Sequence, residues 1–209
     1  MFPNRKMAEK ELEIAGQLNH GPWTEHSMNV GLAAQRVAEK CSNLDPDKAY
    51  VLGLLHDIGR RYGISARRHS IDGYKFMMEK GWDEVARICL THSFPVLDFE
   101  KEIGKNDMSG EESKFVRKYL NEITYDDYDR LLIVCDSLAD AEGFCMLEKR
   151  FVNTTRRYGT FPFTVERWNA TFEMKEYFEQ QMNCSIYEIL PNVKETTFME
   201  APLWKPPVK

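Results

Sequence analysis

Histidine is confined to the first 92 residues of this 209-residue chain, where it occurs five times. Any one histidine on an apolar helix face is more often an ordinary core residue than a ligand. Here, however, three histidines and two aspartates occur at helical spacing on apolar faces. These residues are His26, His56, His92, Asp57 and Asp136. A buried carboxylate is costly unless it is paired or bound to a metal, so their convergence predicts a divalent metal site.

The adjacent pair His56-Asp57 strengthens this prediction. Neighbouring side chains on a helix point about 100° apart, but at a helix end they can still reach one small region. Ile58-Gly59 follows directly and is expected to end the helix. Asp57 can then bind one metal through each of its carboxylate oxygens.

The elements that must position these residues are predicted to be helices, because no stretch shows sustained period-2 alternation. Thr24 is expected to cap a helix to about Cys41, and Asp45-Pro46 to open one ending at Gly59. The tail from Asn192 is expected to be extended, and 94–108 to be a loop. Further helices are predicted over 69–80, 82–91, 109–121, 124–139, 141–154 and 164–182, with a short one from Ser185. The predicted fold class is all-α.

Composition favours a folded protein with a real core, since 43% of residues are hydrophobic and 29% are charged. The chain carries 28 basic and 33 acidic residues, so its net charge is −5. This balance disfavours bulk nucleic-acid binding. The length fits one large domain, or one domain with an appendage.

The cysteines argue against a thiol metal site. They number five, they are widely spaced, and they include no C-x-x-C pair: Cys41, Cys89, Cys135, Cys145 and Cys184. Free thiols point to a reducing compartment, and the first residues lack the apolar core of a signal peptide. We therefore expect a cytoplasmic protein with no membrane segment.

The order of these histidines and aspartates resembles the signature of a known family. His26, His56-Asp57 and Asp136 match the H…HD…D signature of the HD-domain metal-dependent phosphohydrolases. The resemblance spans roughly 23–140, about half of the chain. It implies an HD phosphohydrolase domain over 1–150, with a C-terminal helical extension over 151–209 packed on the same domain. This extension is expected to shape the pocket or an oligomer interface, which leaves a homo-oligomer open.

Two further histidines, His69 and His92, extend the resemblance to dinuclear members of the superfamily, such as the HD-type dinucleoside tetraphosphate hydrolases. The resemblance implies one metal on His26, His56, Asp57 and Asp136, and a second on His69 and His92 with Asp57 bridging. Such ligands suit Fe, Mn, Ni, Co or Mg. The implied reaction is hydrolysis of a phosphate ester or anhydride by a metal-bridging hydroxide, with Asp57 as the central catalytic residue.

A basic segment follows the HD pair. Residues 60–75 contain five cations and one acid, a local charge of +4. Guanidinium groups suit phosphate, so Arg60, Arg61, Arg67 and Arg68 are the candidate substrate-binding residues, with Arg60 and Arg68 preferred. The expected partner is a small phosphate-bearing substrate, in the first place a nucleotide. His20 is assigned to a loop.

Two alternatives stay open. The first is a single-metal nucleotidase that uses only His26, His56, Asp57 and Asp136. The second is a regulator that binds metal or nucleotide without turnover. A cyclic-dinucleotide phosphodiesterase of the HD-GYP type is disfavoured, because Arg60-Arg61-Tyr62 stands where that signature would continue.

Overall fold

The fold is a bundle of helices, seen in a computed structural model that describes residues 1–199. The first half contains α1 to α5, with a short 3-10 helix, η1, directly after the HD pair. Their bounds are α1 Arg5–Leu18, α2 Trp23–Ala38, α3 Pro46–Leu55, η1 Ile58–Tyr62, α4 Arg68–Glu79 and α5 Asp83–Thr91. The predicted all-α fold is confirmed.

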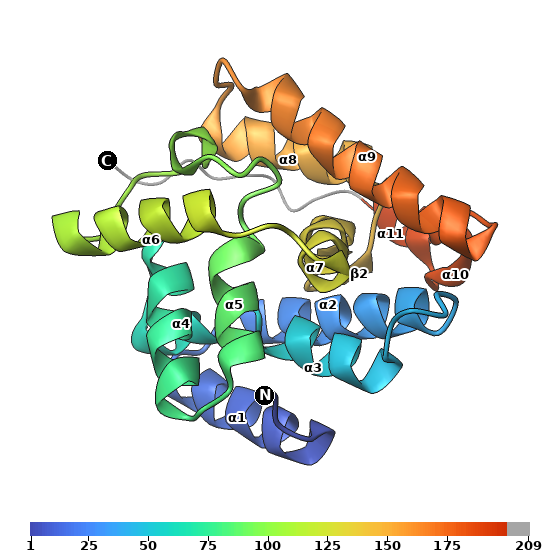
Figure 1. Ribbon diagram of the computed structural model, residues 1–209. Helices are drawn as coiled ribbons and strands as arrows, with labels where there is room; N and C mark the ends of the chain where they lie inside the picture. The colour runs from blue at the N-terminus through green and yellow to red at the C-terminus, as the bar shows by residue number, and fades with distance from the viewer. Residues whose placement is uncertain (200–209) are drawn as a thin grey trace.

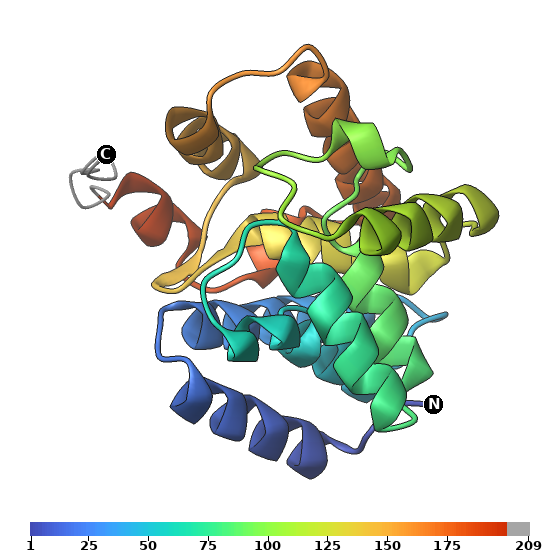
Figure 2. The same cartoon turned by 90° about the vertical axis from the view of Figure 1, so that its left-hand side faces the viewer.

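The second half contains α6 to α11, a second 3-10 helix and a small antiparallel ribbon. The bounds are η2 Phe99–Lys101, α6 Gly110–Glu122, α7 Asp127–Leu138, β1 Ala139–Asp140, β2 Gly143–Phe144, α8 Leu147–Tyr158, α9 Thr164–Met182, α10 Ile186–Ile189 and α11 Val193–Phe198. Figures 1 and 2 show α7 between the α1–α5 layer and the α8–α9 pair. Within the described residues, no helix has the length and apolar character needed to cross a bilayer.

Helix starts follow the capping chemistry of the sequence. The Asp45 side chain accepts hydrogen bonds from the backbone of Asp47 and Lys48, and Pro46 occupies the first turn. Ser109 and Glu112 form a reciprocal capping box at the start of α6. Both of these predicted starts are confirmed. Thr24, in contrast, lies inside α2 rather than capping it.

Two sequence predictions in the second half are wrong. The sequence predicts one helix over 141–154, but β1 and β2 pair there and α8 begins only at Leu147. Gly143 allows this turn because its φ of 135° lies in a region that L side chains avoid. The tail is predicted to be extended from Asn192, yet α11 follows that residue. Pro202, Pro206 and Pro207 lie outside the described residues.

One continuous core joins the two halves of the chain. Val30 of α2, Leu55 of α3 and Leu132 of α7 are fully buried in it. Phe178 of α9 and Ile186 of α10 belong to the same core, and these helices pack on α7 and α2, which carry Asp136 and His26. Burial of this apolar surface is the main force that holds the two layers together.

Glycines set the closest helix contacts. A Cβ added to Gly53 of α3 would stand 2.7 Å from the Gly31 Cα of α2. A Cβ on Gly59 of η1 would stand 2.0 Å from the His69 carbonyl oxygen of α4. Each of these contacts needs a residue without a side chain. The first contact brings His26 toward His56, and the second brings His69 toward Asp57.

Candidate metal centre

Asp57 lies at the centre of the His and Asp cluster. Its Oδ1 atom is 3.2 Å from Nε2 of His69 and 3.5 Å from Nε2 of His92. Its Oδ2 atom is 3.8 Å from Nε2 of His56 and accepts a hydrogen bond from Nε of Arg60. The two carboxylate oxygens therefore face two different sets of histidines.

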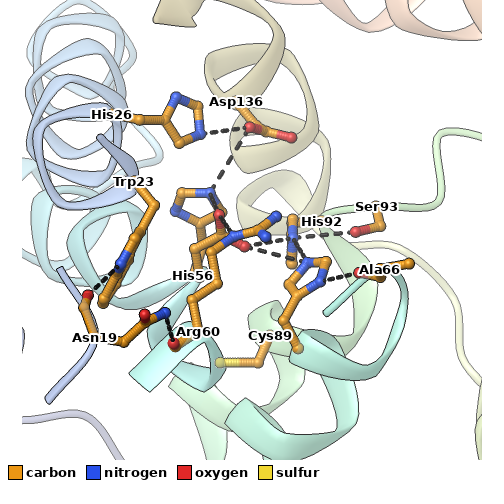
Figure 3. A network of polar contacts seen from close by, with 12 residues as sticks. Asn19, Trp23, His26, His56, Arg60, Ala66, Cys89, His92, Ser93 and Asp136 are labelled. Atoms are coloured by element: carbon orange, nitrogen blue, oxygen red, sulfur yellow. Dashed lines mark hydrogen bonds and ion pairs between the residues drawn. The ribbon is translucent and has the colours of Figure 1, made fainter. Parts of the chain in front are cut away.

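His26 and Asp136 complete the set around His56. The Asp136 Oδ1 atom lies 2.9 Å from Nε2 of His26 and 3.7 Å from Nε2 of His56 (Figure 3). The Asp136 side chain is 27% exposed, whereas His56 and Asp57 are almost completely buried. This side of the cluster therefore opens toward solvent at Asp136.

Three histidine rings are held with Nε2 facing the cluster. The Nδ1 atoms of His56, His69 and His92 lie 2.7, 2.5 and 3.0 Å from the carbonyl oxygens of Gly53, Ala66 and Ile88. A carbonyl only accepts, so each Nδ1 carries the proton and donates it. In its neutral form, each ring then presents the lone pair of Nε2 to the cluster, as metal-ligating histidines do.

The cluster meets the chemical requirements of a divalent metal. His26, His56 and Asp57 have ligand atoms within 4.8 Å of one another, and so do Asp57, His69 and His92. Among residues 1–199, three buried atoms of this cluster have no hydrogen-bond partner: His26 Nδ1, His56 Nε2 and Asp57 Oδ1. Buried polar atoms are rarely left unpaired, and His56 Nε2 and Asp57 Oδ1 both face the cluster. Nitrogen and oxygen donors without thiolate suit Mn, Fe, Co, Ni or Mg.

Electrostatics favour the cation-binding state at Asp57, His69 and Asp136, whereas at His56 burial is outweighed by the carboxylates of Asp57 and Asp136, which raise its pKa. Burial alone would raise the pKa of Asp57, but the Arg60 guanidinium beside it holds that pKa well below its usual range. Burial and the Arg60 charge lower the pKa of His69 to about 3, so its ring is neutral at pH 7. For Asp136, burial is likewise opposed by His26 and His56, and its pKa is lowered.

A cavity of about 1250 Å³ opens over the cluster. Five of the six candidate ligands line it, namely His26, Asp57, His69, His92 and Asp136, while His56 is buried behind them. The opposite wall is formed largely by α8 and the start of α9. A pocket of this size exceeds what a single phosphate group needs.

The four candidate substrate-binding arginines differ in whether they reach the cavity. Of the four, Arg60 alone lines this cavity among the described residues. Arg61 contacts Glu11 and lies over the ring of Phe76. Arg67 donates to the backbone carbonyls of residues 99, 102 and 103. Arg68 forms ion pairs with Glu112 and Asp72. The Arg61 contacts tie η1 to α1 and α4, whereas those of Arg67 and Arg68 tie the start of α4 to the 99–112 segment. None of the three side chains lines the cavity.

Sequence reasoning missed the α8 side of the cavity. Lys149, Arg150 and Asn153 line it, followed by Arg156 and Arg157. Their spacing places them on one helix face, and this pattern can be recognised in the sequence. The predicted helix stops at residue 154, before the two final arginines, and this boundary hides the signal. His20 is exposed and does not line the cavity, in agreement with its assignment to a loop.

The comparisons with known proteins give one match. The family model described as the HD domain matches residues 23–140, which span α2 to the end of β1 and include all six candidate ligands. Neither the curated proteins nor the solved structures yield a significant match.

Proposed function

The chain belongs to the HD domain family, whose members generally are metal-dependent hydrolases, and we propose that it is a phosphohydrolase acting on a small nucleotide. One observation carries the proposal. The two oxygens of Asp57 face separate histidine sets, with His56 near Oδ2 and His69 and His92 near Oδ1. This arrangement supports two ions that share Asp57.

The ligand sets divide accordingly. His26, His56 and Asp136 would hold one ion with Asp57, while His69 and His92 would hold the other. Divalent metals bound there supply positive charge to phosphoryl oxygens and lower the pKa of water. The protein contributes fixed ligand geometry, because three of the rings are held by backbone carbonyls.

Arg60 is the residue that would position the scissile phosphate. It lines the cavity and donates to Asp57 Oδ2, so its guanidinium already lies beside the cluster. The Asn19 side chain donates to the Arg60 carbonyl at 2.7 Å and fixes the backbone beneath it. When substrate enters, the Arg60 guanidinium can donate to a phosphate oxygen, since its fork geometry offers several donors.

A screen of phosphatase and phosphodiesterase substrates tests the proposal. Nucleotides and dinucleotides are incubated with protein loaded separately with Mn, Fe, Co, Ni or Mg, and released phosphate and mononucleotide are measured. We expect turnover of at least one nucleotide class, and we expect chelation to abolish it. Metal-loaded protein that binds nucleotides and never turns them over would instead indicate a regulator.

A further inference from the structure

Helix α8 turns a polar face toward the metal-centre cavity. Its apolar residues Leu147 and Phe151 are buried, and Phe151, which also reaches the cavity, stacks on Trp168 of α9 with ring centroids 5.5 Å apart. Its other side lines the cavity with basic and amide groups at helical spacing: Lys149, Arg150, Asn153, Arg156 and Arg157. This polar face therefore borders the cavity, and its last residues, Arg156 and Arg157, are also exposed to solvent.

Most cations of this cavity are already engaged by protein groups. Arg150 pairs with Asp140, and Lys149 donates to the Thr196 carbonyl. Arg167 pairs with buried Glu102 at 2.7 Å, and Arg60 pairs with Asp57. Three of these four side chains form ion pairs within the protein, and the fourth, Lys149, donates a hydrogen bond to a backbone carbonyl.

Arg156 and Arg157 differ from those four. Both are exposed, and neither makes an ion pair or a side-chain hydrogen bond with any residue of the described part of the chain. The helix dipole favours cations in the last turn of α8, which accounts for their position along the helix. It does not require that both line the cavity, where no acidic side chain of residues 1–199 pairs with either charge.

We propose that Arg156 and Arg157 bind a second phosphate group of the substrate, distant from the one held at the metal centre. The proposal rests on the proposed function and narrows it to small molecules that carry a chain or pair of phosphates. Guanidinium groups form bidentate contacts with phosphate, and Asn153 adds a neutral donor on the same face. The cavity of about 1250 Å³ has room for both ends of such a molecule.

Binding to metal-free protein separates this inference from the question of catalysis. The full chain is stripped with a chelator, and its affinity for inorganic tripolyphosphate and for orthophosphate is measured by calorimetry. The Arg156→Gln/Arg157→Gln variant is compared with Lys6→Gln/Lys40→Gln, which removes two exposed charges outside the cavity. Circular dichroism checks that both variants are folded.

We expect wild-type protein to prefer tripolyphosphate, and the arginine variant to bind it about tenfold or more weakly, as loss of charge-assisted hydrogen bonds implies. The lysine variant should stay within about twofold of wild type, because isolated surface charges contribute little. Equal affinities in the two variants, or no tripolyphosphate binding by wild type, would overturn the inference. Tighter binding of a single-stranded oligonucleotide than of tripolyphosphate would also overturn it.

A kinetic arm uses the metal-loaded protein. The arginine variant should raise KM for a nucleoside triphosphate about tenfold, while kcat/KM for p-nitrophenyl phosphate changes less than about twofold. An equal loss on both substrates would assign the arginines to the scissile phosphate and contradict the inference. If no substrate is turned over, the proposed function fails and the calorimetric comparison still decides the role of the arginines.

Discussion

Nε2 of His69 lies 3.2 Å from Oδ1 of Asp57, although Asp57 directly precedes η1 and His69 lies in the first turn of α4. The contact exists because Gly59 lets η1 and α4 approach backbone to backbone. It makes Asp57 a shared group, since His56 stands on the side of its other oxygen. The dinuclear interpretation depends on this relationship.

Replacing Asp57 with asparagine should abolish turnover while the protein stays folded. The amide is nearly isosteric with the carboxylate but carries no charge to neutralise a cation. We expect a loss of at least about two orders of magnitude in kcat/KM, since outer-shell partners of metal ligands alone are worth 10–100-fold. Steady-state kinetics and circular dichroism check this. Asp47→Asn, an exposed change on α3, is the matched control and should be silent; full activity in Asp57→Asn would refute the proposed role.

His69→Gln should remove one metal from the centre and leave the other. His69 contacts Asp57 and His92, but it makes no contact with His26 or His56 within hydrogen-bond range among the described residues. We expect metal analysis to show half the wild-type content, with activity lowered at least about tenfold. His20→Gln is the control, because that ring is exposed and outside the cavity. Unchanged metal content with full activity would favour the single-metal alternative.

Gly59→Ala should disturb the centre without touching a ligand side chain. The added methyl would clash with the backbone of α4 at the His69 carbonyl and the Gly73 nitrogen. We expect a loss of about 1–3 kcal/mol in the free energy of unfolding, as overpacked sites show, together with weaker metal binding. Gly110→Ala is the control, because a Cβ at this first residue of α6 would meet nothing within 4 Å. Denaturant unfolding distinguishes the two variants, and equal stabilities would contradict the packing argument.

Glu112→Gln should destabilise the protein at neutral pH and much less in acid. Glu112 accepts from Lys75 at 2.6 Å and from the Ser109 backbone, and these contacts lower its pKa to about 2. The folded pKa lies below the unfolded value of about 4.3, so the stabilisation is present above that value and is lost as pH falls toward 2. Thermal midpoints at pH 7 and pH 3 measure the difference. Glu111→Gln, a change at an exposed neighbour, is the control and should alter neither midpoint. If Glu112→Gln lowers the midpoint more at pH 3 than at pH 7, the predicted pH dependence is wrong.

Several helices are predictable from the sequence because their capping and periodicity are local signals. Asp45-Pro46 and the Ser109–Glu112 capping box start α3 and α6 as expected. The failures occur where tertiary contacts override local propensity. Ala141 and Glu142 favour a helix by composition, but β1 and β2 pair around them and Asp140 is tied to Arg150.

Some residues of the candidate site are likewise predictable from the sequence, and others are not. The sequence predicts His26, His56, Asp57, His69, His92 and Asp136 as one set, and the structure brings their side chains together beside one cavity. Among the arginines, Arg60 is the one nearest to the HD pair in sequence, whereas the partners of Arg68 lie on α4 and α6. No local pattern shows that the polar face of α8 lies opposite the ligands, because that depends on how α8 and α9 pack over α7.

The most direct test of a metal centre shared through Asp57 is the position of metals in a crystal of the wild-type chain, located by anomalous scattering after loading with Mn. We predict two peaks per chain, one on each side of Asp57, with His26, His56 and Asp136 around one and His69 and His92 around the other. A single peak in fully active protein, or peaks away from Asp57, would contradict the shared centre.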